Sequence, residues 1–200
     1  MLAFEGKVFS CKLVILGNSG VGKTSILHRW ATGHWDGSLN TTIGARHQRK
    51  RIRIQNNDVD LFLWDTAGQE QYQALTPYYI RSASIALVVT SVTDQVSFSS
   101  IDYWLTMLRE SCEIYPPVVL VVNKMDLLNE QELSREQILR NYGSLFRNVF
   151  FVSAQSGDQV DELFRYSSEE AFAFTRQYLG QDIKSGVQET RKPDNTSVCC

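Results

Sequence analysis

The sequence of 200 residues lacks the features that would place it in several special classes. Its charges nearly cancel, with a formal net charge of −2, so nothing attracts the whole chain to nucleic acid. No run approaches the roughly 20 apolar residues of a membrane-spanning helix. The first ten residues also lack the long apolar stretch and cleavage site of a secretory signal. We therefore expect a cytoplasmic protein that binds no nucleic acid and gains any membrane contact after synthesis.

Cysteine is scarce, with only four in the chain. Cys11 opens a strand-like run and Cys112 ends a helix-like one, which predicts reduced and mostly buried thiols. The other two, Cys199 and Cys200, are the last two residues. A disulfide between neighbours would close almost no loop. The preceding stretch also offers no His or further Cys to share a metal. Composition alone leaves the use of this pair open.

Short apolar runs alternate with helix-like stretches, and no internal repeat is visible. The strand-like runs are residues 11–16, 51–54, 59–64, 84–89, 118–122 and 149–153, with a hairpin signal, QNND, between the second and third. The helix-like stretches include 23–30, 97–112, 134–142 and 159–178. This order predicts an α/β domain over residues 1–179, with a six-stranded, mainly parallel sheet and about five helices on its two faces. Residues 180–200 read as a disordered tail.

The stretch GNSGVGKTS follows the first apolar run and opens a helix. It matches G-x-x-x-x-G-K-[ST], in which backbone N–H groups and a helix N-terminus surround a phosphate chain. Lys23 is placed to reach the outer phosphates, and the Thr24 hydroxyl can bind Mg²⁺. An ordinary glycine turn is the alternative. The predicted phosphate-binding residues are Gly17, Ser19, Gly20, Val21, Gly22, Lys23, Thr24 and Ser25.

Two later segments predict which base is bound. In NKMD, Asp126 can accept two hydrogen bonds from the adjacent N–H donors of guanine, which adenine lacks, while Asn123 can bond the base and Lys124 can cover it. Alone, this short motif could equally be a surface turn. In FVSAQSG, the candidates are Ser153, Ala154 and Gln155, with the Ala154 N–H directed at the guanine oxygen.

The segment LWDTAGQEQY ends another strand-like run and carries the candidate chemistry. Asp65 is placed to hold Mg²⁺ through water, and Gly68 can direct its N–H to a terminal phosphate. Gln69 can orient an attacking water, although it could also be a solvated loop residue.

These motifs, together with TTIG, resemble the Ras superfamily of small GTPases in order and spacing, from about Lys12 to Leu179. The segment 76–98, Ser19 and the terminal cysteine pair resemble the Rab branch. The resemblance implies a P-loop fold, GTP and GDP as ligands, and Thr42 as a further Mg²⁺ ligand. It also implies that Trp35 packs on guanine, although a core tryptophan is the alternative.

The resemblance also supplies a use for the cysteine pair. Cys199 and Cys200 are similar to a Rab double-geranylgeranyl site, with unmodified thiols as the alternative. Two lipids suit a tail whose charges cancel, because one chain anchors only marginally without a basic patch. The implied location is the cytosolic face of an internal membrane, reached reversibly. The implied partners are an exchange factor, a GTPase-activating protein, effectors, a prenylation escort and a GDP-dissociation inhibitor, around a monomer.

The sequence departs from the Rab pattern at two places. Gln155 stands where a lysine is usual, and His47 stands where Rab proteins carry one of three exposed aromatics. The expected effector surface comprises Ile43, Gly44, His47, Trp64 and Tyr79. The strand around His47 also carries five basic residues: Arg46, Arg49, Lys50, Arg51 and Arg53. They could form a charged edge strand that resists pairing, or a surface for acidic partners or an anionic bilayer.

The sequence therefore predicts a membrane-associated switch that slowly hydrolyses GTP and recruits effectors in vesicle trafficking. No intrinsic catalytic arginine can be assigned, so we expect a partner to stimulate turnover. One alternative is a guanine-binding scaffold with negligible hydrolysis. Another is a different P-loop enzyme, such as a small-molecule kinase, which would bind ATP or transfer phosphate to an acceptor other than water.

Overall fold

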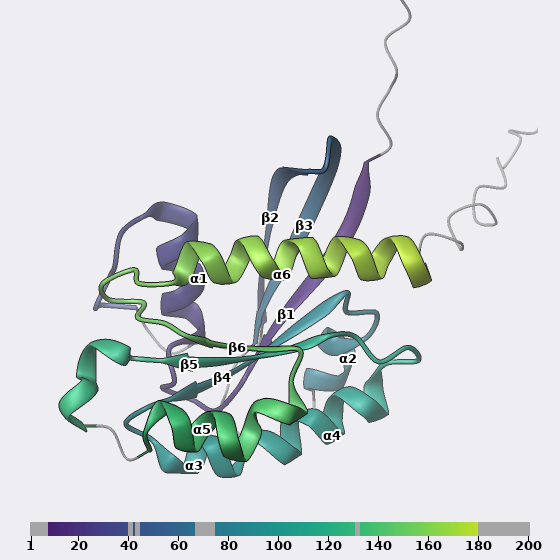
Figure 1. The fold of residues 1–200 in the computed structure, drawn as a ribbon. Coiled ribbons are helices and arrows are strands. Elements are labelled where there is room, and N and C mark those ends of the chain that lie inside the picture. The colour runs from purple at the N-terminus through teal and green to yellow at the C-terminus, as the bar shows by residue number, and fades with distance from the viewer. Residues whose placement is uncertain (1–7, 40–41, 43–44, 67–74, 131–132, 180–200) are drawn as a thin grey trace, which may run out of the picture.

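The computed structural model describes residues 8–39, 42, 45–66, 75–130 and 133–179. Within these ranges, six strands form one sheet in the order β2-β3-β1-β4-β5-β6, and six α-helices pack on it (Figure 1). The elements are β1 (Phe9–Leu16), α1 (Lys23–Thr32), β2 (Ala45–Ile54), β3 (Asn57–Thr66), α2 (Thr76–Ile80), β4 (Ile85–Ser91), α3 (Gln95–Ser99), α4 (Ile101–Ser111), β5 (Val118–Asn123), α5 (Arg135–Tyr142), β6 (Asn148–Phe151) and α6 (Val160–Phe174). Short 3₁₀ segments span Met125–Glu130 and Gly143–Leu145, and a π-helical turn spans Thr175–Leu179.

The sheet is mainly parallel, as predicted. β2 and β3 are antiparallel, whereas β3–β1, β1–β4, β4–β5 and β5–β6 are parallel pairs. The central strands β4 and β5 are buried along their whole length, which explains their continuous apolar sequence. This confirms the predicted α/β P-loop fold. In such a sheet, the loops after the parallel strands meet at one edge, where ligands bind.

Two apolar cores lie on opposite faces of the sheet. One contains Ile26 and Leu27 of α1 and Phe164 of α6, so these two helices cover the same face (Figure 1). The other contains Ile80 of α2 and Trp104 of α4, and α3 and α5 contribute to it as well. The apolar face of α4, formed by Ile101, Trp104, Leu105 and Leu108, is buried in this second core.

The β2–β3 hairpin agrees with the strand predicted around His47, which carries the basic residues from Arg46 to Arg53. The apolar pattern marked only 51–54, but β2 begins at Ala45. Its polar first half is exposed because β2 is an edge strand, so no apolar pattern marked it. The hairpin signal was correct: Gln55 and Asn56, both with positive φ, connect Ile54 to Asn57.

Two predicted helices have different limits in the structure. The stretch 97–112 is divided at Ser100 into α3 and α4, and α3 begins after Asp94, which caps it by accepting a hydrogen bond from the Ser97 N–H. Counting these two as one stretch gives the five helices that were expected. The final helix, predicted over 159–178, is α-helical only to Phe174 and then continues as the π-helical turn. Ser134 and Gln137 form a capping box at the start of α5, the helix predicted over 134–142.

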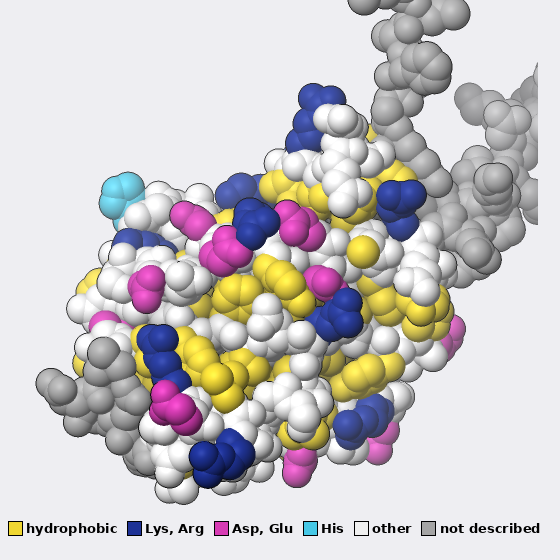
Figure 2. All heavy atoms as spheres, in the orientation of Figure 1, with side chains coloured by type: hydrophobic (Ala, Val, Ile, Leu, Met, Phe, Trp, Pro, Cys, Tyr) yellow, Lys and Arg dark blue, Asp and Glu magenta, His cyan; other side chains and the backbone are white. Residues whose placement is uncertain are grey.

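The expectations for the first two cysteines are confirmed, because Cys11 and Cys112 are both free and buried. Through the described residues, no helix combines the length and the apolar character that crossing a membrane would require. The face in Figure 2 intersperses basic and acidic side chains, in line with the near balance of charge in the sequence. The predicted tail, 180–200, lies outside the described residues.

Candidate nucleotide-binding site

The glycine-rich loop connects β1 to α1, as the motif requires. Gly17 and Gly22 have φ values of 136° and 95°, a region that side chains other than glycine rarely adopt. A Cβ on Gly17 would collide with the Val89 carbonyl, and one on Gly22 would collide with the Asn123 amide. None of the described side chains caps the N-terminus of α1. Its first N–H groups are therefore suited to bind an anion.

Lys23 is buried above this loop. Its side chain Nζ donates to the carbonyl oxygens of Gly17 and Asn18, both at 2.8 Å. Burial lowers the pKa of Lys23 to about 8, and the nearby Asp65 carboxylate partly opposes that shift. Phosphate oxygens would offer this ammonium the negative partners that neutral carbonyls do not.

The three predicted metal ligands come together at the start of α1. The Thr24 hydroxyl donates to Asp65 Oδ2 at 2.7 Å and lies 2.7 Å from the Thr42 hydroxyl, which is itself 3.3 Å from the same carboxylate oxygen. Asp65 Oδ1 is buried, and among the described residues none donates a hydrogen bond to it. Burial raises the pKa of Asp65, with Thr24 and Lys23 opposing the shift. An oxygen-only set with one carboxylate and one unsatisfied oxygen fits Mg²⁺, which takes its remaining ligands from water and phosphate.

Among the residues that the structure describes, no three His, Cys, Asp or Glu side chains cluster to hold a metal.

Asn123, at the end of β5, joins the phosphate loop to the segment after β6. Its side chain is 1% exposed; Nδ2 donates to the Val21 carbonyl at 2.8 Å, and Oδ1 accepts from the Ala154 N–H at 3.1 Å. Asn123 therefore positions two loops whether or not it also contacts a base. The Ala154 N–H, predicted to meet the guanine oxygen, would have to be shared with or released from Asn123.

Asp126 has the exposure that a base contact requires. Its carboxylate is solvent-exposed, and Oδ1 accepts a hydrogen bond from the Ser153 hydroxyl at 2.6 Å. Ser153 Oγ in turn accepts from the Ser156 N–H at 3.0 Å. Lys124 stands between Asn123 and this carboxylate with φ 65°. The NKMD and SAQ segments are thus neighbours in space, as the predicted guanine pocket demands.

Trp35 and Gln155 are both exposed. The Trp35 side chain is 46% exposed, which excludes the core-tryptophan alternative and leaves base packing as a prediction. Gln155 offers its backbone carbonyl to Arg29 of α1 at 3.2 Å, and Arg29 also donates to the Ser156 carbonyl at 2.6 Å. Arg29 therefore braces the SAQ segment, a role that no sequence motif indicated.

A second unpredicted set of contacts holds the phosphate loop to α4. The indole N–H of Trp104, a residue 1% exposed, donates to Asn18 Oδ1 at 3.1 Å. Asn18 Nδ2 donates to the Ser100 hydroxyl at 2.9 Å, at the break between α3 and α4. The Asn18 carbonyl also accepts from Lys23. The apolar pattern of 97–112 marked Trp104 only as a core residue.

Three members of the predicted effector surface form one stack. The rings of His47 and Trp64 lie 5.4 Å apart, and those of Trp64 and Tyr79 lie 5.8 Å apart. Lys12 Nζ lies 4.8 Å from the Trp64 ring. His47 thus occupies an aromatic position geometrically, while adding a ring that can carry charge.

Several predicted residues cannot be placed in this site. Gly68, Gln69, Ile43, Gly44, Cys199 and Cys200 lie outside the described residues.

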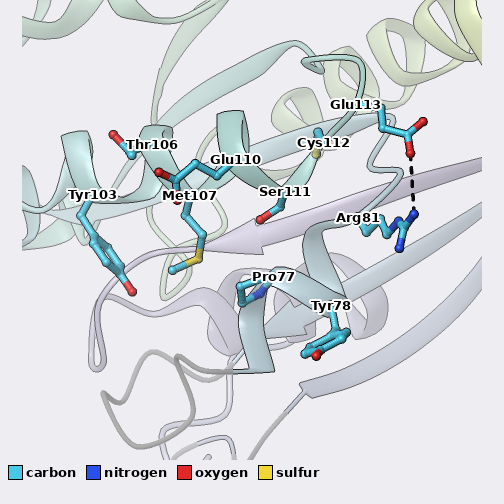
Figure 3. Close-up of a pocket in the computed structure, with 10 residues that line it drawn as sticks. All are labelled: Pro77, Tyr78, Arg81, Tyr103, Thr106, Met107, Glu110, Ser111, Cys112 and Glu113. Carbon is cyan, nitrogen blue, oxygen red and sulfur yellow. Dashed lines mark ion pairs between the residues drawn. The ribbon is translucent and has the colours of Figure 1, made fainter.

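A groove of about 740 Å³ lies between α2 and α4, apart from the predicted nucleotide site. Pro77, Tyr78, Tyr103 and Met107 line it, and the ion pair of Arg81 with Glu113 lies at one end (Figure 3). None of the predicted nucleotide-binding or metal-binding residues lines this groove.

Comparison with known proteins agrees with this geometry. A profile of the Ras family matches residues 12–172. The human Ras-related protein Rab-22A is 34% identical over 154 residues, which cover 76% of this chain and 79% of that protein. The GTP-binding protein ypt3 of Schizosaccharomyces pombe is 35% identical over 203 aligned residues, covering 94% of this chain and 95% of that protein. Because the family profile spans most of the chain and every described nucleotide motif lies at one edge of the sheet, the chain belongs to the Ras family and is a Rab-like small GTPase.

Proposed function

We propose that this chain is a guanine-nucleotide switch that alternates between GTP-bound and GDP-bound forms on an internal membrane. The observation that carries the proposal is the convergence of Lys23, Thr24, Thr42 and Asp65 at the start of α1. Asp126 stands exposed next to Ser153 to select guanine. This arrangement suits a ligand with a phosphate chain at one end and a guanine base at the other.

The phosphate chain is bound by backbone and by one buried cation. The N–H groups of the Gly17–Gly22 loop and of the first turn of α1 donate to phosphate oxygens. Lys23 exchanges its two carbonyl partners for the outer phosphates, which match its charge. Asp65, Thr24 and Thr42 hold Mg²⁺, which when bound neutralises phosphate charge that builds up as the terminal bond breaks.

Hydrolysis depends on positioning and charge rather than on a strong base. Gln69 orients the attacking water, and Gly68 directs its N–H to the terminal phosphate. The structure does not describe these residues, and their roles rest on the DTAGQE motif. Intrinsic turnover is slow, and a GTPase-activating protein stimulates it.

Effectors distinguish the GTP-bound from the GDP-bound form through contacts that depend on the terminal phosphate. Thr42 binds Mg²⁺ in the GTP form, and loss of the terminal phosphate releases this residue together with the segment around Gln69. Effectors recognise the GTP form near Ile43, Gly44 and the ring stack of His47, Trp64 and Tyr79. An exchange factor restores that form by releasing GDP.

Membrane attachment depends on the two C-terminal cysteines. Geranylgeranyl groups on Cys199 and Cys200 anchor the chain to the cytosolic face of an internal membrane. An escort protein assists their addition, and a GDP-dissociation inhibitor extracts the monomer from the bilayer. The similarity to Rab-22A and ypt3 over most of the chain supports a role in vesicle trafficking.

The first test measures fluorescent GDP and GTP binding with Mg²⁺, with ATP as competitor, followed by phosphate release. Guanine-selective binding with slow release is expected, and Gln69→Leu lowers the release further. Guanine binding without release, even with activating proteins, would make the chain a scaffold instead. Equal binding of ATP would contradict the role of Asp126.

The second test concerns the membrane. Full-length protein, prenylated in a cell extract, should sediment with liposomes, whereas Cys199→Ser together with Cys200→Ser should stay in the supernatant. Equal sedimentation of the two proteins would contradict the lipid anchor.

A further inference from the structure

The five basic residues of β2 are not one surface, because they lie on two faces of the hairpin. Arg49 and Arg51 both donate to Asp60, a carboxylate whose side chain is only 8% exposed. Arg46 and Lys50 project from the opposite face, since side chains alternate along a strand. Lys50 Nζ lies 3.8 Å from the ring of Trp30 on α1. The face that carries Arg46 is therefore the one on which α1 packs.

Arg46 has a particular neighbour on that face. It pairs directly with Asp65 in the antiparallel register of β2 and β3, so the two side chains project in the same direction. Asp65 is the metal-binding carboxylate, and its Oδ1 is buried without a partner. The positive charge of Arg46 also acts on this carboxylate and favours its ionised form.

The Arg46 guanidinium and a bound Mg²⁺ would therefore both lie on the same side of the hairpin as the Asp65 carboxylate. Asp65 Oδ2 is already bonded to Thr24 and Thr42, which leaves Oδ1 for a further donor or a metal-bound water. A guanidinium is a permanent cation with several N–H donors, whereas Mg²⁺ brings two positive charges to the same place. Like charges on neighbouring groups raise each other's free energy, and solvent weakens the effect where one of them, here the Arg46 guanidinium, is exposed.

We propose that the positive charge of Arg46, opposite Asp65 on the same face of the hairpin, repels Mg²⁺ at the metal site. This repulsion weakens metal retention and speeds nucleotide release at low Mg²⁺. This inference rests on the proposed function, because it assumes a Mg²⁺-dependent nucleotide site. Among the described residues, none donates a hydrogen bond to Asp65 Oδ1, so the Arg46 charge acts on this carboxylate through space rather than through a bond. Asp65 would hold Mg²⁺ against this charge because the phosphates of a bound nucleotide supply the larger opposite charge.

The experiment measures release of a fluorescent GDP from the full-length protein across a series of buffered free Mg²⁺ concentrations. The midpoint of this curve reports how tightly the metal is held in the complex. Arg46→Gln keeps the length of the side chain and removes its charge. The midpoint should fall by roughly three- to tenfold, the size expected for one charge acting at a partly screened site. Arg46→Lys, which keeps the charge, should restore most of the wild-type midpoint.

The matched control is Arg53→Gln. Arg53 lies on the same strand and loses the same charge, but it pairs with Asp58 and projects from the other face. Its midpoint should equal that of the wild type. Raising the salt concentration should reduce the difference between Arg46→Gln and wild type, because the guanidinium is exposed.

Each result decides the inference. An unchanged midpoint in Arg46→Gln, a rise in that midpoint, or an equal shift in Arg53→Gln would overturn it. If the wild type binds GDP with a clear Mg²⁺ midpoint that Arg46→Gln leaves unmoved, only this inference fails. If the wild type retains no GDP at any Mg²⁺ concentration, the proposed function fails and the inference falls with it.

Discussion

The phosphate end and the base end of the site differ in how far their polar groups are satisfied without a ligand. At the phosphate end, Lys23 and Asp65 are buried, and each has a pKa shifted toward its neutral form by burial. One carboxylate oxygen there has no partner. At the base end, the buried Asn123 has a donor and an acceptor in use, and the exposed Asp126 is held by Ser153. The first end needs its ligand to balance buried charge, whereas the second is satisfied without one.

This difference assigns different tasks to the two ends. Buried, incompletely compensated charges raise the free energy of the ligand-free protein, so they are expected to dominate affinity. A pre-positioned, solvated carboxylate costs the protein little and can discriminate between bases by which donors they present. The phosphate end is therefore expected to govern how tightly a nucleotide is held, and the base end which nucleotide it is.

The largest effect should come from removing the buried cation. Lys23→Ala should weaken GDP and GTP binding by about 1,000-fold, because a desolvated charge pair with phosphate contributes about 4 kcal/mol. Equilibrium competition against a fluorescent GDP measures this. Lys50→Ala removes the same charge beside Trp30 and should leave affinity within about twofold. If Lys23→Ala bound GDP and GTP almost as tightly as the wild type, the phosphate end would not govern nucleotide affinity.

The next effect tests the base end. Asp126→Ala should lower guanine-nucleotide affinity by about 100-fold, since it removes two charge-assisted hydrogen bonds. The weak binding of ATP should not change, so the ratio of the two affinities is the decisive measurement. Asp161→Ala removes an exposed carboxylate at the start of α6 and serves as the control. Equal losses for GDP and ATP would mean that Asp126 supports the fold rather than the base.

A smaller effect concerns pH and the ligand-free protein. Lys23 has a pKa of about 8 when folded, against an ordinary value of 10.5. Between these values the unfolded chain holds a proton that the folded protein has released, so stability rises with pH across this window. The free energy of unfolding should therefore increase by about 2 kcal/mol from pH 8 to 10, relative to Lys23→Met. Denaturant titration measures the free energy of unfolding at each pH. If it changed with pH in the same way in both proteins, the lowered pKa of Lys23 would be contradicted.

The smallest effect tests how the phosphate end is held. Trp104→Phe removes the N–H that Asn18 accepts, which should cost about 1 kcal/mol and speed GDP release about fivefold. Asn18→Ala should have a similar effect, and the double variant should add little to either single change. Stopped-flow release of fluorescent GDP measures all three. Fully additive effects would show that Trp104 only fills the core.

Much of the site was predictable because it is encoded in contiguous motifs. The spacing within GNSGVGKTS defines a loop and a helix start, so Lys23 and Thr24 followed directly from local sequence. The apolar runs likewise predicted β4 and β5, whose burial leaves no other arrangement. In β2 the apolar pattern marked only 51–54, because an exposed edge strand has no apolar face along its first half, and the run of basic residues marked the rest.

Other residues of the site could not be found this way. Arg29, Asn18 and Trp104 act through partners 82 or more residues distant in sequence, and no local pattern connects them. The five basic residues of β2 looked like one surface in the sequence. The register of the hairpin divides them, with Arg49 and Arg51 turned to Asp60 and Arg46 turned to the face of α1.

By itself, the sequence determined the family of folds and the phosphate loop, and it predicted a preference for guanine, because each is encoded in short motifs. Only the tertiary structure decided which side chains share a buried carboxylate, which helix holds the phosphate loop, and which face each β2 cation occupies. Those properties depend on strand register and on the meeting of distant segments. Long-range packing determines both, and local sequence does not.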